Sequence, residues 1–219
     1  MEEMIENKIC FIMCTNDKQY EEEAFNYINR LYIPTGYEID AISVKDAISM
    51  PSGYNEAMKV SDAKYKIYLH QDVFLINKNL LIDMLEIFSN REIGMIGVVG
   101  VEKLPWHGIM WHEPRVGELW MSATDKMEKG KEGKIENKWK EVEAIDGLLM
   151  ITQYDVLWRE DLFDGWDFYD VSQSLEMRKK GHKVVVPKQK TTWCIHDSGS
   201  LNLKNYYKYR EIFQREYLT

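Results

Sequence analysis

Along the first half of the chain, segments with the hydrophobic pattern of strands alternate with segments that have the pattern of helices. Apolar runs at 8–14 and 37–44 have the length of buried strands, and residues 18–31 carry apolar side chains at helical spacing. A helix is expected at 54–63, after a Pro-Ser-Gly turn, and a third strand at 64–75. Because strand–helix–strand units usually join parallel strands, this order predicts an α/β fold with a mostly parallel central sheet flanked by helices.

The second half of the chain mixes regular elements with segments that lack a clear period. Residues 103–120 are rich in Trp and His and are expected to form a loop, and the charged residues 126–141 are expected to form a solvated loop. Asp146-Gly147 interrupts a strand predicted at 142–152. The remaining predicted elements are a helix at 77–90, a strand at 94–101, a helix at 171–180, strands at 182–186 and 191–195, and a helix at 201–218.

Composition narrows the class of protein. The 219 residues contain no repeat or linker and suit one domain spanning 1–219, and a hydrophobic fraction of 45% indicates a packed core. The net charge of −8 argues against a protein built mainly to bind nucleic acid. Three cysteines without Cys-x-x-Cys spacing, and a start without a signal-peptide pattern, favour the cytoplasm. The longest apolar run, 93–101, is too short for a membrane helix.

Chemically capable side chains stand where predicted elements begin or end. The third strand delivers His70, Gln71 and Asp72 to its C-terminal end, where open α/β sheets bind ligands. Asp72 has apolar neighbours, so its carboxylate costs free energy unless a cation meets it; on this evidence a turn cap and a metal ligand are equally good interpretations. Asp170 begins a helix and His196 follows the last strand, and each alone also fits a plainer role as a helix cap or a loop histidine.

Together with Asp146-Gly147, these residues resemble the GT-A fold of nucleotide-sugar glycosyltransferases. The likeness is to small bacterial, family-2-like members, some of them linked to capsule or surface polysaccharide synthesis. It covers residues 8 to about 200, and its most specific pieces are 68–73, 146–147 and 168–171 leading to 178–184. The resemblance implies a Rossmann-like, nucleotide-binding half at about 8–101, an acceptor and catalytic half at about 102–200 with a small antiparallel part, and a C-terminal helix at 201–218.

The resemblance also implies a divalent-metal site and a catalytic base. Such enzymes hold a cation against the departing diphosphate with an Asp-x-Asp motif, which here is His70-Gln71-Asp72. Asp72 matches the metal ligand, and His70 replaces the usual first acid. His196 matches a histidine that completes the site in many relatives, so Mn²⁺ or Mg²⁺ is the expected cofactor. Asp170 matches the base that must reach the acceptor hydroxyl.

The remaining matches concern the substrates. Residues matching the nucleotide side are Thr15, Asn16, Asn55, His70 and Gln71. Asp146 and Gly147 match positions that contact the donor sugar or the acceptor, although a glycine in a strand also fits a β-bulge. Sugars stack on aromatic faces, so the tryptophans are candidate acceptor platforms, although Trp is more often simply core. These are Trp106, Trp111 and Trp166.

The implied function is a metal-dependent, inverting transfer of a sugar from a nucleotide-diphosphate sugar, with UDP the favoured nucleotide, to a saccharide or lipid-linked acceptor in capsule or other polysaccharide biosynthesis. The incomplete Asp-x-Asp motif leaves a second hypothesis open, a non-catalytic nucleotide-sugar-binding protein with a degenerate GT-A domain. A nucleotidyltransferase would need a glycine-rich basic loop after the first strand, which this chain lacks. The Tyr-, Lys- and Arg-rich helix at 201–218 either packs on the protein, forms a dimer contact or docks peripherally on the inner face of a membrane.

Overall fold

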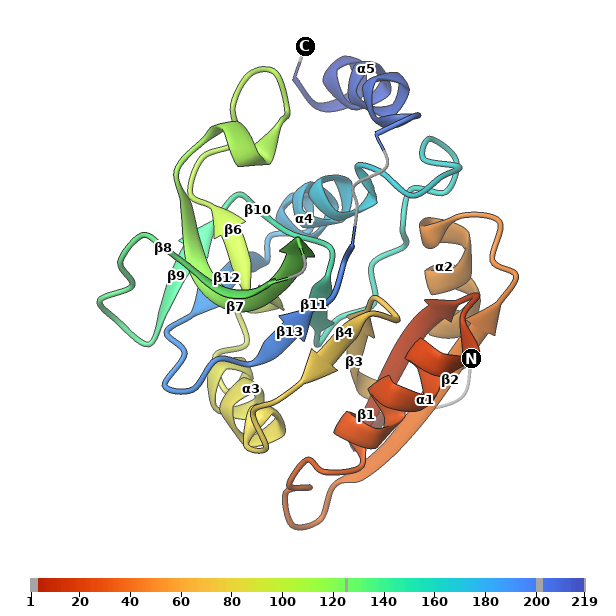
Figure 1. The fold of residues 1–219 in the computed structure, drawn as a ribbon, viewed down its shortest axis with the longest axis vertical. Coiled ribbons are helices and arrows are strands. Elements are labelled where there is room, and N and C mark those ends of the chain that lie inside the picture. Colours follow the sequence, from red (N-terminus) through yellow and green to blue (C-terminus); the bar gives the residue numbers. More distant parts are fainter. Residues whose placement is uncertain (1–3, 125, 200–202, 219) are drawn as a thin grey trace.

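Two sheets form the framework of the chain, seen in the computed structural model, which describes residues 4–124, 126–199 and 203–218 (Figure 1). In this part of the chain the larger sheet has seven strands. β1, β2, β3, β5 and β12 run parallel, and β11 and β9 run antiparallel to their neighbours. In spatial order the strands are β2 (Glu38–Lys45), β1 (Ile5–Thr15), β3 (Ala63–Leu69), β11 (Leu149–Thr152), β5 (Ile93–Gly97), β12 (Lys183–Pro187) and β9 (Trp139–Val142). The predicted mostly parallel sheet is therefore confirmed.

A smaller, mostly antiparallel sheet lies against the first, and it confirms the antiparallel part that was expected. Its described strands are β10 (Ala144–Ile145), β6 (Val99–Val101), β7 (Arg115–Thr124), β13 (Cys194–His196) and β4 (Val73–Leu75), with β8 (Lys126–Glu132) paired to β7. Three predicted strands split between the two sheets. β3 and β4, β5 and β6, and β11 and β10 each belong to one predicted strand, and the break between β3 and β4 falls at His70, Gln71 and Asp72.

Helices cover both faces of the larger sheet because its central strands are apolar on both sides. Along β1, Ile9 and Phe11 enter a core with α1 and α3, whereas Cys10 and Ile12 enter a second core with α2 and α4. The helices α1, α3 and α4 begin within three residues of their predicted starts. The predicted Pro-Ser-Gly turn is wrong, because α2 already begins at Met50 and Pro51 lies in its first turn, where its missing N–H costs nothing. The bounds are α1 (Lys18–Ile28), α2 (Met50–Val60), α3 (Leu80–Phe88) and α4 (Tyr169–Lys179).

The C-terminal helix α5 (Tyr206–Tyr217) packs on the protein, which was one of the alternatives for this segment. Tyr206, Tyr209 and Phe213 are buried in a third core, beside Phe168 and the segment around the short 3₁₀ turn Met110–His112. Its aromatic face is thus occupied by protein. In the described ranges no helix combines the length and the apolar character needed to cross a bilayer.

The two loops predicted in the second half were wrong in part, because β7 and β8 form a long hairpin. Their pairing leaves β8 largely exposed, so hydrophobicity gives no strand signal there. The ribbon is instead stabilised by charges facing each other across the strands. The buried carboxylate of Glu118 lies 3.1 Å from Lys129 Nζ and 3.2 Å from Lys131 Nζ, and Arg115 pairs with Glu132.

The fully buried Lys66 of β3 generates a stability prediction. Its ammonium donates to the Ala63 carbonyl at 2.7 Å and lies 2.9 Å from the Asp155 carboxylate. Asp155→Ala leaves that charge without its counterion and should lower the free energy of unfolding by about 3 kcal/mol. Urea denaturation measures the loss, and Lys66→Met in the same background should restore most of it. A loss below about 1 kcal/mol for Asp155→Ala would show that water replaces the carboxylate.

Candidate active site

The turn between β3 and β4 brings two predicted residues beside a third from the end of the chain. His70 and Asp72 lie in this turn, and β13 pairs with β4 so that His196 faces Val73. The Asp197 N–H donates to the Asp72 carbonyl at 2.9 Å and locks the two segments together. One ligand atom from each of His70, Asp72 and His196 lies within 4.8 Å of the others. The structure therefore assembles the predicted metal ligands, with His70 as a third member.

The protonation states of His70 and Asp72 suit a cation. Burial and the adjacent His196 lower the pKa of His70 to about 4, so its imidazole is neutral at pH 7. Burial works to raise the pKa of Asp72, but His196 outweighs it and the pKa is lowered. The Asp72 Oδ1 atom is buried, accepts no hydrogen bond from the described residues and lies 3.5 Å from His196 Nε2. A buried carboxylate oxygen without a donor, between two imidazoles, fits Mn²⁺ or Mg²⁺.

A cleft of about 840 Å³ opens beside this group at the C-terminal ends of the parallel strands. Its described lining includes no Lys or Arg. A polyanionic ligand would therefore find few positive charges there other than a bound cation and the histidines. The lining residues are Cys14, Thr15, Asn16, Asp46, Ala47, Met50, His70, Gln71, Asp72, Trp166, His196 and Ser198.

Gln71 braces the floor of the cleft. Its Oε1 atom accepts hydrogen bonds from Thr15 Oγ1 at 2.9 Å and from the backbone N–H groups of Asn16 and Asp17 at 3.0 and 3.1 Å. Its Nε2 atom donates to Asn16 Oδ1 at 2.8 Å. The side chain thus ties the end of β1 to the β3–β4 turn. Thr15 is largely buried by this arrangement, while Asn16 is exposed at the cleft.

Asp170 stands in the first turn of α4, where the helix N-terminus meets the turn before β11. Its Oδ2 atom accepts from the Gly147 N–H at 3.0 Å, and its Oδ1 atom accepts from the Val171 N–H at 2.8 Å. Burial, followed by the negative charge of Asp146, raises the pKa of Asp170 to about 7. A carboxyl group with this pKa is well matched to proton transfer at neutral pH.

Gly147 lies where no side chain fits. A Cβ atom at this position would overlap the Tyr169 hydroxyl and lie 2.9 Å from Asp170 Cβ. Its neighbour Asp146 accepts from the Leu148 N–H at 3.1 Å and lines a small pocket together with His196. Asp146 therefore stands between the metal-binding group and Asp170, and Gly147 permits the close packing of α4 that puts them there.

Asn55 and two of the tryptophans lie elsewhere. Asn55 is 1% exposed, and its amide exchanges two hydrogen bonds of 3.0 Å with the Trp158 backbone, so it joins α2 to the segment after β11 and does not reach the cleft. Trp106, 79% exposed, lies against α5, and Trp111 packs on Tyr206. Trp166, 51% exposed, does line the cleft.

Several residues of the cleft and the site were not predicted from the sequence, among them Asp46, Met50 and Tyr169. Asp46 has a positive φ of 58° and lines the cleft with Met50, after a strand whose end carried no recognised motif. Tyr169 contacts His70 Nε2 through its hydroxyl. Its position directly before Asp170 was the signal that the sequence offered, but a tyrosine at the start of a helix is usually interpreted as a core residue.

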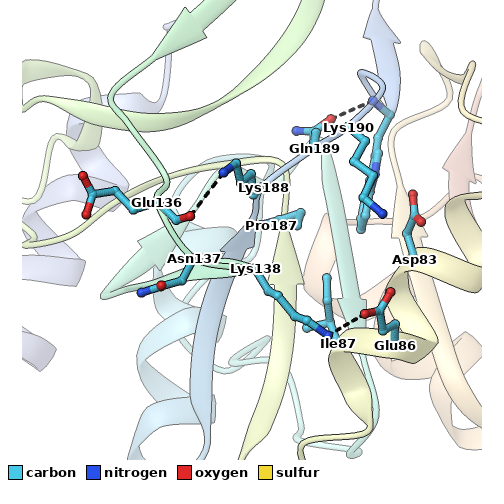
Figure 2. Close-up of a pocket in the computed structure, with 11 residues that line it drawn as sticks. Asp83, Glu86, Ile87, Glu136, Asn137, Lys138, Pro187, Lys188, Gln189 and Lys190 are labelled. Carbon is cyan, nitrogen blue, oxygen red and sulfur yellow. Dashed lines mark hydrogen bonds and ion pairs between the residues drawn. The ribbon is translucent and has the colours of Figure 1, made fainter.

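A second cleft, of about 550 Å³, lies between α3 and residues 187–193 and shares no lining residue with the first (Figure 2). Lys138 crosses it to Glu86 at 2.6 Å, and Lys188 Nζ donates to the Glu136 carbonyl at 3.2 Å. Lys138 and Glu86 form an ion pair within its lining, and none of the predicted site residues reaches it.

Comparison with known families identifies the chain. The model of the glycosyltransferase-like family matches residues 10–217. The chain belongs to this glycosyltransferase family. Its mixed α/β fold is the one found in GT-A glycosyltransferases of known structure. No curated protein matches the glycosyltransferase significantly.

Solved structures share the fold at low sequence identity. Residues 1–349 of S. aureus TarS are 12% identical with a TM-score of 0.56, over 92% of this chain and 63% of TarS. The mannosyltransferase PcManGT from Pyrobaculum calidifontis, in complex with GDP-Man and Mn²⁺, is 11% identical with a TM-score of 0.57, over 96% and 61%. Drosophila β1,4-galactosyltransferase 7, with manganese and UDP-Gal, is 12% identical with a TM-score of 0.53, over 87% and 70%. The glycosyltransferase thus spans less than two thirds of the first two structures.

The raised pKa of Asp170 predicts a pH-dependent stability. Its folded pKa of about 7 exceeds the ordinary value of 3.8, so the folded state binds more protons and loses stability as pH rises between these values. Asp170→Asn does not titrate and keeps an acceptor for the Gly147 N–H. At pH 8 it should therefore be more stable than wild type by about 2 kcal/mol, with the advantage shrinking toward pH 4. Urea titrations at both pH values test this, and an advantage that is independent of pH would contradict the assigned pKa.

Proposed function

We propose that this glycosyltransferase uses Mn²⁺ or Mg²⁺ to transfer a sugar, with inversion, from a UDP-linked donor to a saccharide or lipid-linked acceptor in the synthesis of capsule or another surface polysaccharide. One observation carries the metal dependence: the cleft has no Lys or Arg in its described lining, and the His70, Asp72 and His196 group stands at its edge. The complexes of TarS with UDP-GlcNAc and of PcManGT with GDP-Man and Mn²⁺ support the donor class.

The donor half of the proposal follows the cleft. Thr15 and Asn16 at the end of β1 receive the nucleoside, and Asp146 faces the donor sugar from the pocket that it shares with His196. Asp72 and His196 hold the cation, which when bound neutralises the diphosphate and acts as a Lewis acid toward the leaving group. Trp166 offers an exposed aromatic face to a sugar at the rim.

The acceptor half depends on Asp170. An acceptor hydroxyl loses its proton to this carboxylate while its oxygen bonds to the anomeric carbon, and the bond from that carbon to the diphosphate oxygen breaks on the opposite side. A pKa of about 7 keeps a large ionised fraction at neutral pH and retains basicity. One base and a direct displacement give inversion at the anomeric carbon.

Asp72→Ala tests the metal site. In wild type, UDP should raise the melting temperature only when Mn²⁺ is present, because a ligand that binds the native state alone stabilises it. The variant loses the anionic ligand and should lose this Mn²⁺-dependent shift, and His196→Ala should weaken it less. Glu92→Ala, which removes an exposed carboxylate paired with Lys183, is the control and should keep the full shift. An unchanged shift in Asp72→Ala would leave Asp72 as a turn cap.

Asp170→Asn tests the base. The variant should bind Mn²⁺ and the donor as wild type does, while transfer to an acceptor and slow donor hydrolysis fall by about 10²- to 10⁴-fold. Released UDP is the measurement. The matched control is Asp167→Asn, because burial also raises the pKa of this carboxyl three residues earlier; it should keep release within a few-fold.

Two results would change the proposal. Equal release from wild type and Asp170→Asn would move the base elsewhere or indicate a retaining route. Donor binding by wild type without transfer to a range of saccharide and lipid-linked acceptors would favour the non-catalytic binding protein.

A further inference from the structure

A tyrosine hydroxyl contacts the group formed by His70, Asp72 and His196. The Tyr169 hydroxyl is in hydrogen-bond contact with His70 Nε2. Tyr169 is only 5% exposed, and burial raises the pKa of its hydroxyl well above the ordinary value, so it stays a neutral phenol. Its ring is wedged against Tyr54 and Trp158 in the core. The hydroxyl is therefore a fixed partner for the imidazole.

With Nε2 engaged, the other nitrogen of His70 faces the site. His70 Nδ1 lies 3.9 Å from Asp72 Oδ1, and His196 Nε2 lies 3.5 Å from the same oxygen. Ligand atoms that surround one ion at about 2.1 Å lie roughly 3 to 4 Å apart, so each of the two imidazole nitrogens stands at coordinating separation from the Asp72 oxygen. Nδ1 coordinates only with its lone pair free, and this requires the tautomer in which Nε2–H donates to the Tyr169 oxygen.

We propose that Tyr169 is a positioning residue that holds His70 in this tautomer as a third protein ligand of the cation, and that α4 thereby couples the metal site to the base. The proposal rests on the metal site of the proposed function and adds to it. In the Asp-x-Asp pattern a carboxylate stands at the position of His70, and a carboxylate can bind a cation with either of its oxygens. An imidazole presents one correct nitrogen, so here a second residue must orient it.

The coupling follows from consecutive residues. Tyr169 and Asp170 are the first two residues of α4, after Phe168 at a positive φ of 62°. The first contacts His70, and the second accepts from the Gly147 N–H at 3.0 Å. Gly147 lies against both side chains, so neither can shift without the other. A change in the contact of Tyr169 with His70 therefore displaces the carboxylate next to it.

Tyr169→Phe removes only the hydroxyl. Isothermal titration of the full chain with Mn²⁺ should give a dissociation constant raised about 10- to 100-fold, as for other lost partners of ligating histidines. Tyr217→Phe is the matched control, since its hydroxyl bonds to Ser172 and Glu176 of the same helix outside the site. It should leave the dissociation constant unchanged. In a His70→Ala background, Tyr169→Phe should cause no further loss, because it acts only through His70.

Two spectroscopic readings separate orientation from a merely structural role. Imidazole ¹⁵N shifts of the metal-free protein should show the Nε2–H tautomer of His70 in wild type and a mixture in Tyr169→Phe. Electron–nuclear double resonance of bound Mn²⁺ should count two histidine nitrogens in wild type and one in His70→Ala, which tests the third ligand even if Tyr169→Phe does not fold.

The outcomes separate the two proposals. Wild type that binds no Mn²⁺, with or without UDP, overturns the metal site and this inference together. Wild type that binds Mn²⁺ while Tyr169→Phe matches its affinity, or adds its full loss to that of His70→Ala, overturns the inference alone. A single histidine nitrogen on Mn²⁺ in wild type does the same.

Discussion

The position of one carboxylate constrains the whole site. Asp72 Oδ1 is buried at the end of β3, accepts no hydrogen bond from the described residues and stands between two imidazoles. Burying an ionised oxygen in this way costs several kcal/mol unless a positive charge meets it. The described lining of the cleft supplies histidines and no Lys or Arg, so the compensation comes from protonation of His196 or from a cation.

The two-sheet architecture brings the residues of this site together. Predicted single strands break as they pass from the larger to the smaller sheet, and two of these breaks carry site residues. The break after β3 carries Asp72, the break before β11 carries Asp146, and β13 returns His196 beside β4. Residues more than a hundred positions apart therefore meet because strand pairing, not loop flexibility, sets their separation.

The sequence predicted the parts that local patterns encode and missed those set by tertiary contacts. Strand ends and the His70-Gln71-Asp72 motif were sufficient to place the cleft. Asn55 has the polarity of a ligand-binding residue, but its amide forms hydrogen bonds with the backbone N–H and carbonyl of Trp158. No local sequence pattern predicts this tertiary contact. The β7–β8 hairpin was not predicted because β8 is largely exposed and rich in charged residues. Tyr169 resembled core until the fold brought its hydroxyl to His70.

The proposed roles of Asp72 and Asp170 require pKa values shifted in opposite directions, and the surroundings of each carboxyl group provide the shift. A metal ligand must stay ionised, and the adjacent His196 lowers the pKa of Asp72 despite its burial. A base must hold a proton readily, and burial with Asp146 nearby raises the pKa of Asp170 to about 7. Asp146 serves both ends, since its charge also favours protonated His196. A bound cation would displace a proton from His196, and its charge would also favour ionised Asp170. If the proposed roles hold, occupation of the metal site and ionisation of Asp170 are therefore linked through charge as well as through the proposed contact of α4.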